Sequence, residues 1–226
     1  RIHEDARIEG NSFSHVEVKT ILDGVTVGGH SIYDHQQIIN LKKAYEHTMK
    51  LIRSSPQGGL KIAPNDFLNL NGMVAYEEAL EWGCFRGEGS EKYYSPKVSL
   101  GEDRIFEPLP TMAGGKNIRD AFEKGAHYLN NVESPLERAM AMAMFGAMGQ
   151  FCFDGNKRTS RLMMNAILVS NGVEAIGIPV SRIQEYNERM VDFYTTRDAT
   201  TMFEFMVSLH PEFKLIQKDN LDMVSS

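Results

Sequence analysis

The chain has 226 residues, of which 42% are hydrophobic and 24% are charged. This balance excludes a disordered or fibrous protein, and a chain of this length can bury a sizeable core in one domain. No apolar run reaches the roughly 18 residues that a membrane-spanning helix needs, and no N-terminal stretch has a signal-peptide pattern. Two cysteines, Cys84 and Cys152, make no disulfide framework or zinc site. A reducing compartment is the default for such a chain, so we expect a cytoplasmic protein without a membrane partner.

The net charge is −6, from 24 basic and 30 acidic side chains. Nonspecific binding to nucleic acid depends on neutralising phosphates with Lys and Arg, so this balance predicts no nucleic-acid partner. A local basic cluster could still bind a small phosphate ligand.

Helical periodicity dominates the chain. Apolar residues recur at three- and four-residue spacing from Ser31 to Ile52 and predict the first long helix. Ser134 and Pro135 begin a segment that is apolar almost all round, which predicts a buried central helix ending near Met148. Further helices are predicted at residues 65–80, 158–170, from 181, and 199–209.

A different pattern occupies residues 93–110. Short β-branched and aromatic runs flank the turn residues 101–103, which predicts a β-hairpin or extended flap. The chain has no internal repeat and no domain linker. We therefore predict one mainly α-helical domain with a small hairpin over residues 1–213, followed by a polar tail at 214–226.

The strongest chemical signal lies at residues 150–161, Gln-Phe-Cys-Phe-Asp-Gly-Asn-Lys-Arg-Thr-Ser-Arg. The turn at 154–156 directly precedes a helix start, whose first N–H groups lack internal partners and carry the positive end of the helix dipole. Lys157, Arg158 and Arg161 add three cations within the first turns. Together these features predict an anion site, best suited to a polyphosphate.

Asp154 stands beside this predicted site. Its carboxylate could hold Mg²⁺, which favours carboxylate oxygens together with phosphate oxygens. The alternative is an ordinary capping turn with a solvated basic face. The all-apolar helix before the loop favours the anion site, because a polar turn at the end of a buried helix faces a cleft more often than open water.

Residues 150–161 resemble the signature loop of the Fic/Doc (Fido) family, His-x-Phe-x-Asp/Glu-Gly-Asn-Gly/Lys-Arg-x-x-Arg. The matching positions are Asp154, Gly155, Asn156, Lys157, Arg158 and Arg161. Near the N-terminus, IEGNSFSHVEV resembles the family's inhibitory-helix motif Ser/Thr-x-x-x-Glu-Gly/Asn, with Glu9 in place and Asp5 where Ser or Thr is usual. Residues 93–110 fall where the family has its target-docking flap. The resemblance covers roughly residues 1–209.

The resemblance implies a Fic-type helical bundle that uses ATP and Mg²⁺, most often to transfer AMP to a hydroxyl of a target protein docked at the flap. The implied ligand residues are Gly155, Asn156 and Lys157 for the anion hole, Arg158 and Arg161 for phosphate, and Asp154 for Mg²⁺. Glu9, in an inhibitory helix at about residues 1–22, would block the γ-phosphate site by pairing with Arg161. A homodimer is compatible with the sequence.

Three positions bear on catalysis. Gln150 falls on the family's catalytic His, and a neutral amide cannot take the proton of a target hydroxyl. Losing a general base typically costs about 10²–10⁴ in rate. Cys152 replaces the family's Phe and is expected to point into the core rather than act as a nucleophile. We expect His127 to be a structural or surface histidine, not a substitute base.

Several functions therefore remain open. The first is an ATP-binding Fic-family protein, autoinhibited by Glu9, with impaired or lost transferase activity. The second is an active protein adenylyltransferase or, because Lys157 also occurs at this position in Doc-type toxins, a phosphotransferase. A third is a helical interaction protein with a vestigial anion loop. The sequence names no target protein.

Overall fold

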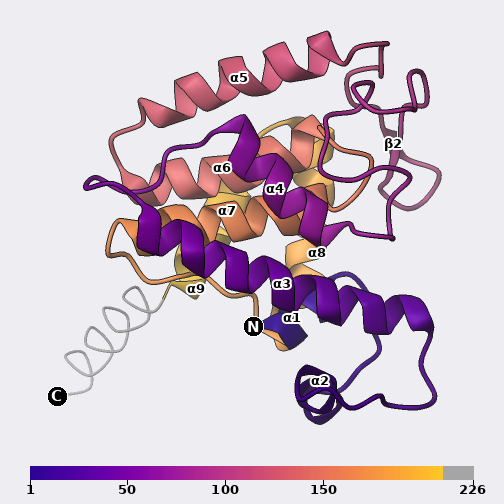
Figure 1. Ribbon diagram of the computed structural model, residues 1–226. Helices are drawn as coiled ribbons and strands as arrows, with labels where there is room; N and C mark the ends of the chain where they lie inside the picture. The colour runs from indigo at the N-terminus through magenta and orange to yellow at the C-terminus, as the bar shows by residue number, and fades with distance from the viewer. Residues whose placement is uncertain (211–226) are drawn as a thin grey trace, which may run out of the picture.

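The computed structural model describes residues 1–210, which are helical apart from one short hairpin (Figure 1). The helices of these residues are α1 (Ile2–Ile8), α2 (His15–Leu22), α3 (Ile32–Ser54), α4 (Pro64–Val74), α5 (Lys116–Asn130), α6 (Pro135–Gly149), α7 (Asn156–Ser170), α8 (Ile183–Thr196) and α9 (Thr200–Leu209). A single 3₁₀ turn, η1 (Val180–Arg182), precedes α8. The predicted tail at 214–226 lies outside the described residues. The mainly α-helical fold that the sequence predicts is confirmed.

The centre of the fold is the pair α6 and α7, which pack against each other more extensively than any other elements of residues 1–210. Ser134 caps α6 by accepting the N–H of Glu137, and Pro135 occupies the first turn, as the sequence predicts. The two helices approach closely, since a side chain at Gly146 would collide with Ser160 on α7. This close packing fixes the loop that joins them.

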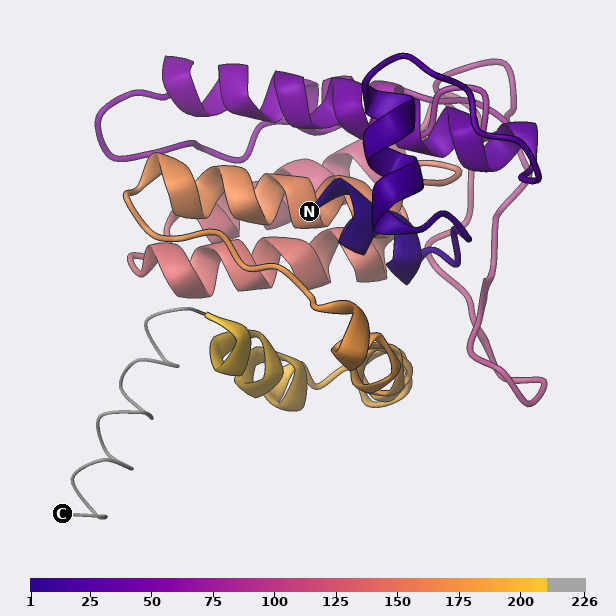
Figure 2. The same cartoon turned by 90° about the horizontal axis from the view of Figure 1, so that it is seen from below.

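The other helices cover this central pair in layers. Seen from below, α3 and α4 lie on one side of α6 and α7, and α8 and α9 lie on the other (Figure 2). Tyr194 of α8 donates a hydrogen bond to the carbonyl of Ala147 in α6 at 2.8 Å, which ties the second layer to the centre. No helix of residues 1–210 combines the length and the apolarity needed to cross a membrane.

A cluster of phenylalanine rings forms the part of the core that lies against the loop between α6 and α7. Phe151, in that loop, has its ring centroid 5.0 Å from that of Phe122 and 4.9 Å from that of Phe145. Phe67 and Phe85 complete the cluster and contact Phe122. Because Phe151 is fully buried, the loop is anchored in the core by its own side chain.

The N-terminal segment, expected as one inhibitory helix over about residues 1–22, forms two helices. The chain turns after Glu9 at Gly10, whose φ is +84°, and Ser14 then begins α2 with a capping box to Glu17. A small separate core joins both helices to α3. It consists of Ala6, Phe13, Val18, Ile21, Ile38 and Leu41.

Two further elements differ from the sequence-based expectation. The predicted helix at 65–80 ends at Val74, because the chain turns sharply through Ala75 and Glu77, the latter with φ +57°. Helix α5 was not predicted, although Ile118 and Phe122 place apolar side chains four residues apart on its buried face.

The predicted hairpin is present. β1 (Val98–Ser99) pairs antiparallel with β2 (Ile105–Phe106), with Val98 opposite Phe106. The hairpin lies on the side of α8, where the ring centroid of Phe106 is 4.9 Å from that of Tyr194 (Figure 2). We call residues 93–110 the flap below.

Candidate functional site

The loop between α6 and α7 exposes the start of α7. Gly155 caps this helix in the left-handed conformation, with φ +74°, and no side chain accepts the first N–H groups of the helix. A Cβ at Gly155 would lie 3.1 Å from Val74 and 3.2 Å from Ala75 at the end of α4. Glycine is therefore favoured here by both conformation and space. The free N–H groups and the helix dipole make this end of α7 suited to an anion.

Gln150 ends α6 with its backbone in the left-handed region, at φ 45° and ψ 48°. Its amide is buried and bonded at both ends: Nε2 donates to the carbonyl of Ala147 at 2.7 Å, and Oε1 accepts from Nδ2 of Asn156 at 3.2 Å. Asn156 in turn bonds the carbonyl of Cys152 at 2.8 Å and the N–H of Cys152 at 2.9 Å. The side chains of Gln150 and Asn156 thus brace the loop from inside.

Cys152 and His127 lie where the sequence predicts. Cys152 is fully buried, and burial raises the pKa of its thiol well above the ordinary value, which favours the neutral thiol over a nucleophilic thiolate. His127 lies on the exposed face of α5. Neither residue offers a base beside the loop.

Arg86, a buried residue outside the loop, holds the loop through its backbone. Nε of Arg86 donates to the carbonyl of Gln150 at 2.6 Å, while its terminal nitrogens donate to Oγ1 of Thr111 at 2.6 Å and to the carbonyl of Leu109 at 2.8 Å. Burial lowers the pKa of Arg86 to about 10. No carboxylate of residues 1–210 pairs with this side chain. Arg86 therefore ties the loop to the end of the flap and places a buried positive charge between them.

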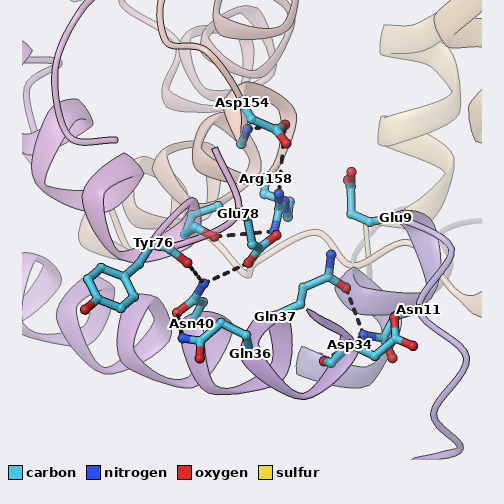
Figure 3. Close-up of polar contacts among 12 residues, drawn as sticks. Glu9, Asn11, Asp34, Gln36, Gln37, Asn40, Tyr76, Glu78, Asp154 and Arg158 are labelled. Carbon is cyan, nitrogen blue, oxygen red and sulfur yellow. Dashed lines mark hydrogen bonds and ion pairs between the residues drawn. The ribbon is translucent and has the colours of Figure 1, made fainter. Parts of the chain in front are cut away.

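Arg158 lies in the first turn of α7, and its side chain is only 4% exposed. Nη1 donates to Oε2 of Glu78 at 2.7 Å and to the carbonyl of Val74 at 3.4 Å. Nη2 lies 3.9 Å from Oδ1 of Asp154 (Figure 3). Nε is buried and has no hydrogen-bond partner in the described part of the chain.

Glu78 is itself held from α3. Its Oε1 accepts a hydrogen bond from Nδ2 of Asn40 at 2.8 Å, and Asn40 is 0% exposed. Asn40 also donates to the carbonyl of Tyr76 at 2.8 Å and accepts from Gln36 at 2.9 Å. A continuous chain of hydrogen bonds therefore runs from α3 through Glu78 to Arg158 (Figure 3).

Arg161 lies one turn further along α7, with its side chain 6% exposed. Nη2 donates to Oε1 of Glu9 at 3.1 Å, and Nε donates to Oδ1 of Asp5 at 3.0 Å. Nη1 donates to the hydroxyl of Tyr186 at 3.4 Å. The other oxygen of Asp5 accepts a hydrogen bond from Tyr45. The structure thus brings Glu9 onto Arg161, as the resemblance implies, and adds Asp5. We call Asp5 and Glu9 on Arg161 the acid clasp.

The protonation states of the acid clasp follow from these contacts. Burial alone would raise the pKa of Glu9, but the charges of Arg161, Lys157 and Arg158 outweigh burial and hold that pKa below its ordinary value. Burial opposes the charge of Arg161 in the same way, and Tyr186, Asp5 and Glu9 together raise its pKa. Glu9 and Arg161 therefore form an ion pair at neutral pH.

Lys157 and Asp154 line the open side of the loop. Lys157 is partly buried and has no ion-pair partner among residues 1–210. The Asp154 side chain is 59% exposed, and its Oδ1 accepts the N–H of Gly155 at 2.5 Å. In the described part of the chain no three His, Cys, Asp or Glu side chains are grouped to hold a metal ion. A lone exposed carboxylate fits Mg²⁺ only when phosphate oxygens and water complete its coordination.

The flap reaches the loop through one aromatic contact. Tyr94 stacks on Phe153, with ring centroids 6.3 Å apart and an interplanar angle of 20°. Tyr93 and Tyr94 are exposed, so the flap presents aromatic surface beside Asp154.

Sequence reasoning missed Asp5, Glu78, Asn40 and Arg86 as site residues. A signal existed for Asp5, because the four-residue spacing to Glu9 places both carboxylates on one side of a helical turn. No local pattern pointed to Glu78, Asn40 or Arg86, whose partners are far away in the sequence.

The curated proteins to which this chain is similar in sequence share one name, protein adenylyltransferase Fic or fic-1. The chain is 28% identical over 192 residues to protein adenylyltransferase Fic of Drosophila grimshawi, covering 82% of this chain and 36% of that protein. It is 27% identical over 192 residues to protein adenylyltransferase fic-1 of Caenorhabditis elegans, covering 82% of this chain and 34% of that protein. The chain thus spans about a third of the length of these curated relatives. No family model matches it.

Solved structures agree on the fold. A Fic family protein from Desulfovibrio desulfuricans G20 superposes with a TM-score of 0.71 at 18% identity, covering all of this chain and 64% of that one. Fic-1 from C. elegans superposes with a TM-score of 0.72 at 20% identity, covering all of this chain and 63% of that one. This chain is therefore similar in sequence to proteins named Fic adenylyltransferases and shares its fold with solved Fic proteins.

Proposed function

We propose that the start of α7 binds ATP. In this proposal the backbone N–H groups of Gly155, Asn156 and Lys157 hold the phosphates, and Arg158 and Arg161 neutralise them. The similarity to proteins named adenylyltransferases supports this assignment. The charges support it as well, because three cations gather at a helix start within a chain of net charge −6.

Glu9 is proposed to hold this site in an autoinhibited state. The observation that carries the proposal is the contact of the acid clasp with Arg161: two carboxylates occupy Nε and Nη2, the nitrogens that a phosphate would use. Four carboxylates pair with the two arginines when Glu78 and Asp154 are included. A polyphosphate therefore gains little attraction until an acid withdraws.

Mg²⁺ would be held by Asp154 together with phosphate oxygens, and it would neutralise charge on the phosphates. The chain's own residues do the rest. The start of α7 orients the phosphates, and Arg158 and Arg161 offset their charge. The flap is proposed to dock a target protein, whose side chain would approach between Tyr94 and Asp154.

Gln150 decides the chemistry in this proposal. AMP transfer joins the target hydroxyl oxygen to the α-phosphorus, releases pyrophosphate and frees the hydroxyl proton. Gln150 cannot accept that proton, and its amide is already bonded inside the loop, so we propose impaired or lost transferase activity. The alternative is an active adenylyltransferase or a phosphotransferase, in which water or the target takes the proton. The phosphotransferase is part of this alternative because Doc-type toxins also have Lys at the position of Lys157.

Calorimetric titration with ATP and Mg²⁺ tests the proposal. Glu9→Ala is expected to bind ATP about tenfold more tightly than the wild type, because it removes a competitor for Arg161. Glu4→Ala is the matched control, since Glu4 lies on α1 but is not among the carboxylates of residues 1–210 that pair with Arg161. Equal affinity in Glu9→Ala and Glu4→Ala would contradict autoinhibition. Absence of binding in all three proteins would refute the nucleotide site.

Transfer is measured separately. The Glu9→Ala protein is incubated with ATP labelled at the α- or the γ-phosphate. We expect no label on protein. Transfer of the α-label would support the adenylyltransferase alternative, and transfer of the γ-label would support the phosphotransferase.

A further inference from the structure

An arginine binds a phosphate best through one edge of its planar guanidinium, where Nε and one terminal nitrogen point the same way. In Arg161 this edge is filled, because Nε bonds Asp5 and Nη2 bonds Glu9. In Arg158 the matching edge makes no close hydrogen bond: Nε is buried and has no partner among residues 1–210, and Nη2 reaches only the exposed Asp154 at 3.9 Å. The protein acceptors of Arg158 all lie on Nη1.

Glu78 is therefore placed differently from the acids of the clasp. It binds Nη1 at 2.7 Å and leaves the Nε and Nη2 donors unused (Figure 3). A carboxylate in this position fixes the rotation of the guanidinium without covering the edge that would face a phosphate. It also partly neutralises a buried charge that would otherwise lack a close partner.

The support behind Glu78 is built into the core. Glu78 is 11% exposed, and both of its oxygens are used, Oε2 on Arg158 and Oε1 on Asn40. Asn40 is fully buried in the 23-residue helix α3, and its amide is bonded on both sides. Glu9, in contrast, follows a seven-residue helix that packs Ala6 on the small separate core and Ile8 on the main core. Withdrawal of Glu78 would therefore break a buried hydrogen-bond network that reaches into α3.

We propose that Glu78 is a positioning residue that orients Arg158 for a nucleotide phosphate, with Asn40 as its buried support. The proposal rests on the nucleotide site proposed above and adds a residue to it. Under this proposal Glu9 and Glu78 act in opposite directions. Glu9 blocks an arginine, whereas Glu78 prepares one.

The test is ATP affinity in the Glu9→Ala background, in which the wild-type block is weakened. Glu78→Gln is expected to weaken ATP binding by about tenfold, because a charge-assisted hydrogen bond that orients Arg158 becomes a neutral one. Glu77→Gln is the matched control: it is the same change at the neighbouring, exposed residue of the same turn. Its affinity is expected to equal that of the Glu9→Ala parent.

A spectroscopic measurement separates orientation from general loss of structure. Nitrogen-15 NMR of arginine side chains reports whether the terminal nitrogens of Arg158 rotate slowly. We expect slow rotation in the parent and in Glu77→Gln, and fast rotation in Glu78→Gln, while the Arg161 signals stay unchanged. If Glu78→Gln does not fold, Glu78→Asp keeps the charge but shortens its reach, and it is expected to weaken ATP binding as well.

The outcomes are distinct. Tighter ATP binding in Glu78→Gln would show that Glu78 competes with phosphate and would overturn the proposal. Unchanged binding would also overturn it and leave the nucleotide site standing. Absence of ATP binding in the parent and in Glu77→Gln would remove the nucleotide site, and this proposal with it.

Discussion

Arg158 and Arg161 stand three residues apart on α7, and both are buried against carboxylates, yet their surroundings are built differently. Arg161 is held by Asp5 and Glu9, which precede it by 156 and 152 residues and belong to the N-terminal helix and its end. Arg158 is held by Glu78, which is tied into the long helix α3 through Asn40. We propose that the acids on Nε and Nη2 of Arg161 block that arginine, whereas the acid on Nη1 of Arg158 orients it.

The difference also concerns how easily each acid can leave. α1 is seven residues long and buries two side chains, Ala6 on the small separate core and Ile8 on the main core. Local opening of so short a segment disturbs few core contacts. Removal of Glu78 from Arg158 would leave Asn40 and Arg158 with unmet bonds in the interior. In this proposal, the affinity of the site for an anion changes when Glu9 leaves Arg161, while Glu78 stays on Arg158.

The largest expected effect is on the rate of AMP transfer, which also compares the acids of the two arginines. In the Glu9→Ala background, Gln150→His is expected to raise transfer of α-labelled AMP by about 10²–10⁴, because it restores a titratable base at the loop. Gln150→Asn is the control, since it disturbs the same hydrogen bonds without adding a base. In the Gln150→His protein, adding Glu78→Gln should lower transfer, whereas restoring Glu9 should also lower it but with recovery at high ATP. If transfer depended on ATP concentration in the same way in both variants, Glu78 and Glu9 would not have different roles.

The second prediction concerns stability. Replacing both clasp acids, Asp5→Ala with Glu9→Ala, leaves the buried Arg161 without a carboxylate and should destabilise the ligand-free protein by about 3–5 kcal/mol. ATP with Mg²⁺ should recover much of this loss, because a phosphate replaces the missing acids. Thermal melting with and without ATP measures both quantities.

The single variant Glu9→Ala keeps Asp5 and should lose less stability, and Glu4→Ala should lose little. Equal losses in Glu4→Ala and the double variant would speak against a specific role of the clasp. A loss in the double variant that ATP does not recover would place the destabilisation outside the anion site.

The smallest expected effect is the pH dependence of the stability that Glu9 contributes. The pKa of Glu9 in the folded protein lies below the ordinary value of 4.5, so its contribution to stability is present above that value and is lost as pH falls through the lower, folded pKa. The difference in unfolding free energy between the wild type and Glu9→Gln should therefore shrink between about pH 6 and about pH 3. Urea unfolding at the two pH values measures it. A difference that stays constant would mean that Glu9 acts through packing rather than charge.

The sequence carried the parts of this site that depend on local spacing. The capped start of α6, the glycine turn at Gly155 and the cations that follow it are all encoded within a few residues, and each lies where it was predicted. Glu78 could not be predicted in the same way. The helical pattern runs on past Val74, whereas the chain in fact turns there, and the resulting contact with Arg158 joins residues 80 positions apart.

Helix α3 touches both halves of the site. Gln37 accepts a hydrogen bond from Asn11, just after Glu9, at 3.0 Å, and Asn40 supports Glu78 (Figure 3). These two positions are three residues apart, which corresponds to a rise of about 4.5 Å along one helix face. The spacing of these two positions on α3 therefore helps to set where Glu9 and Glu78 meet α7. A single residue inserted between Gln37 and Asn40 would turn the two positions apart by about 100° and leave one arginine without its acid.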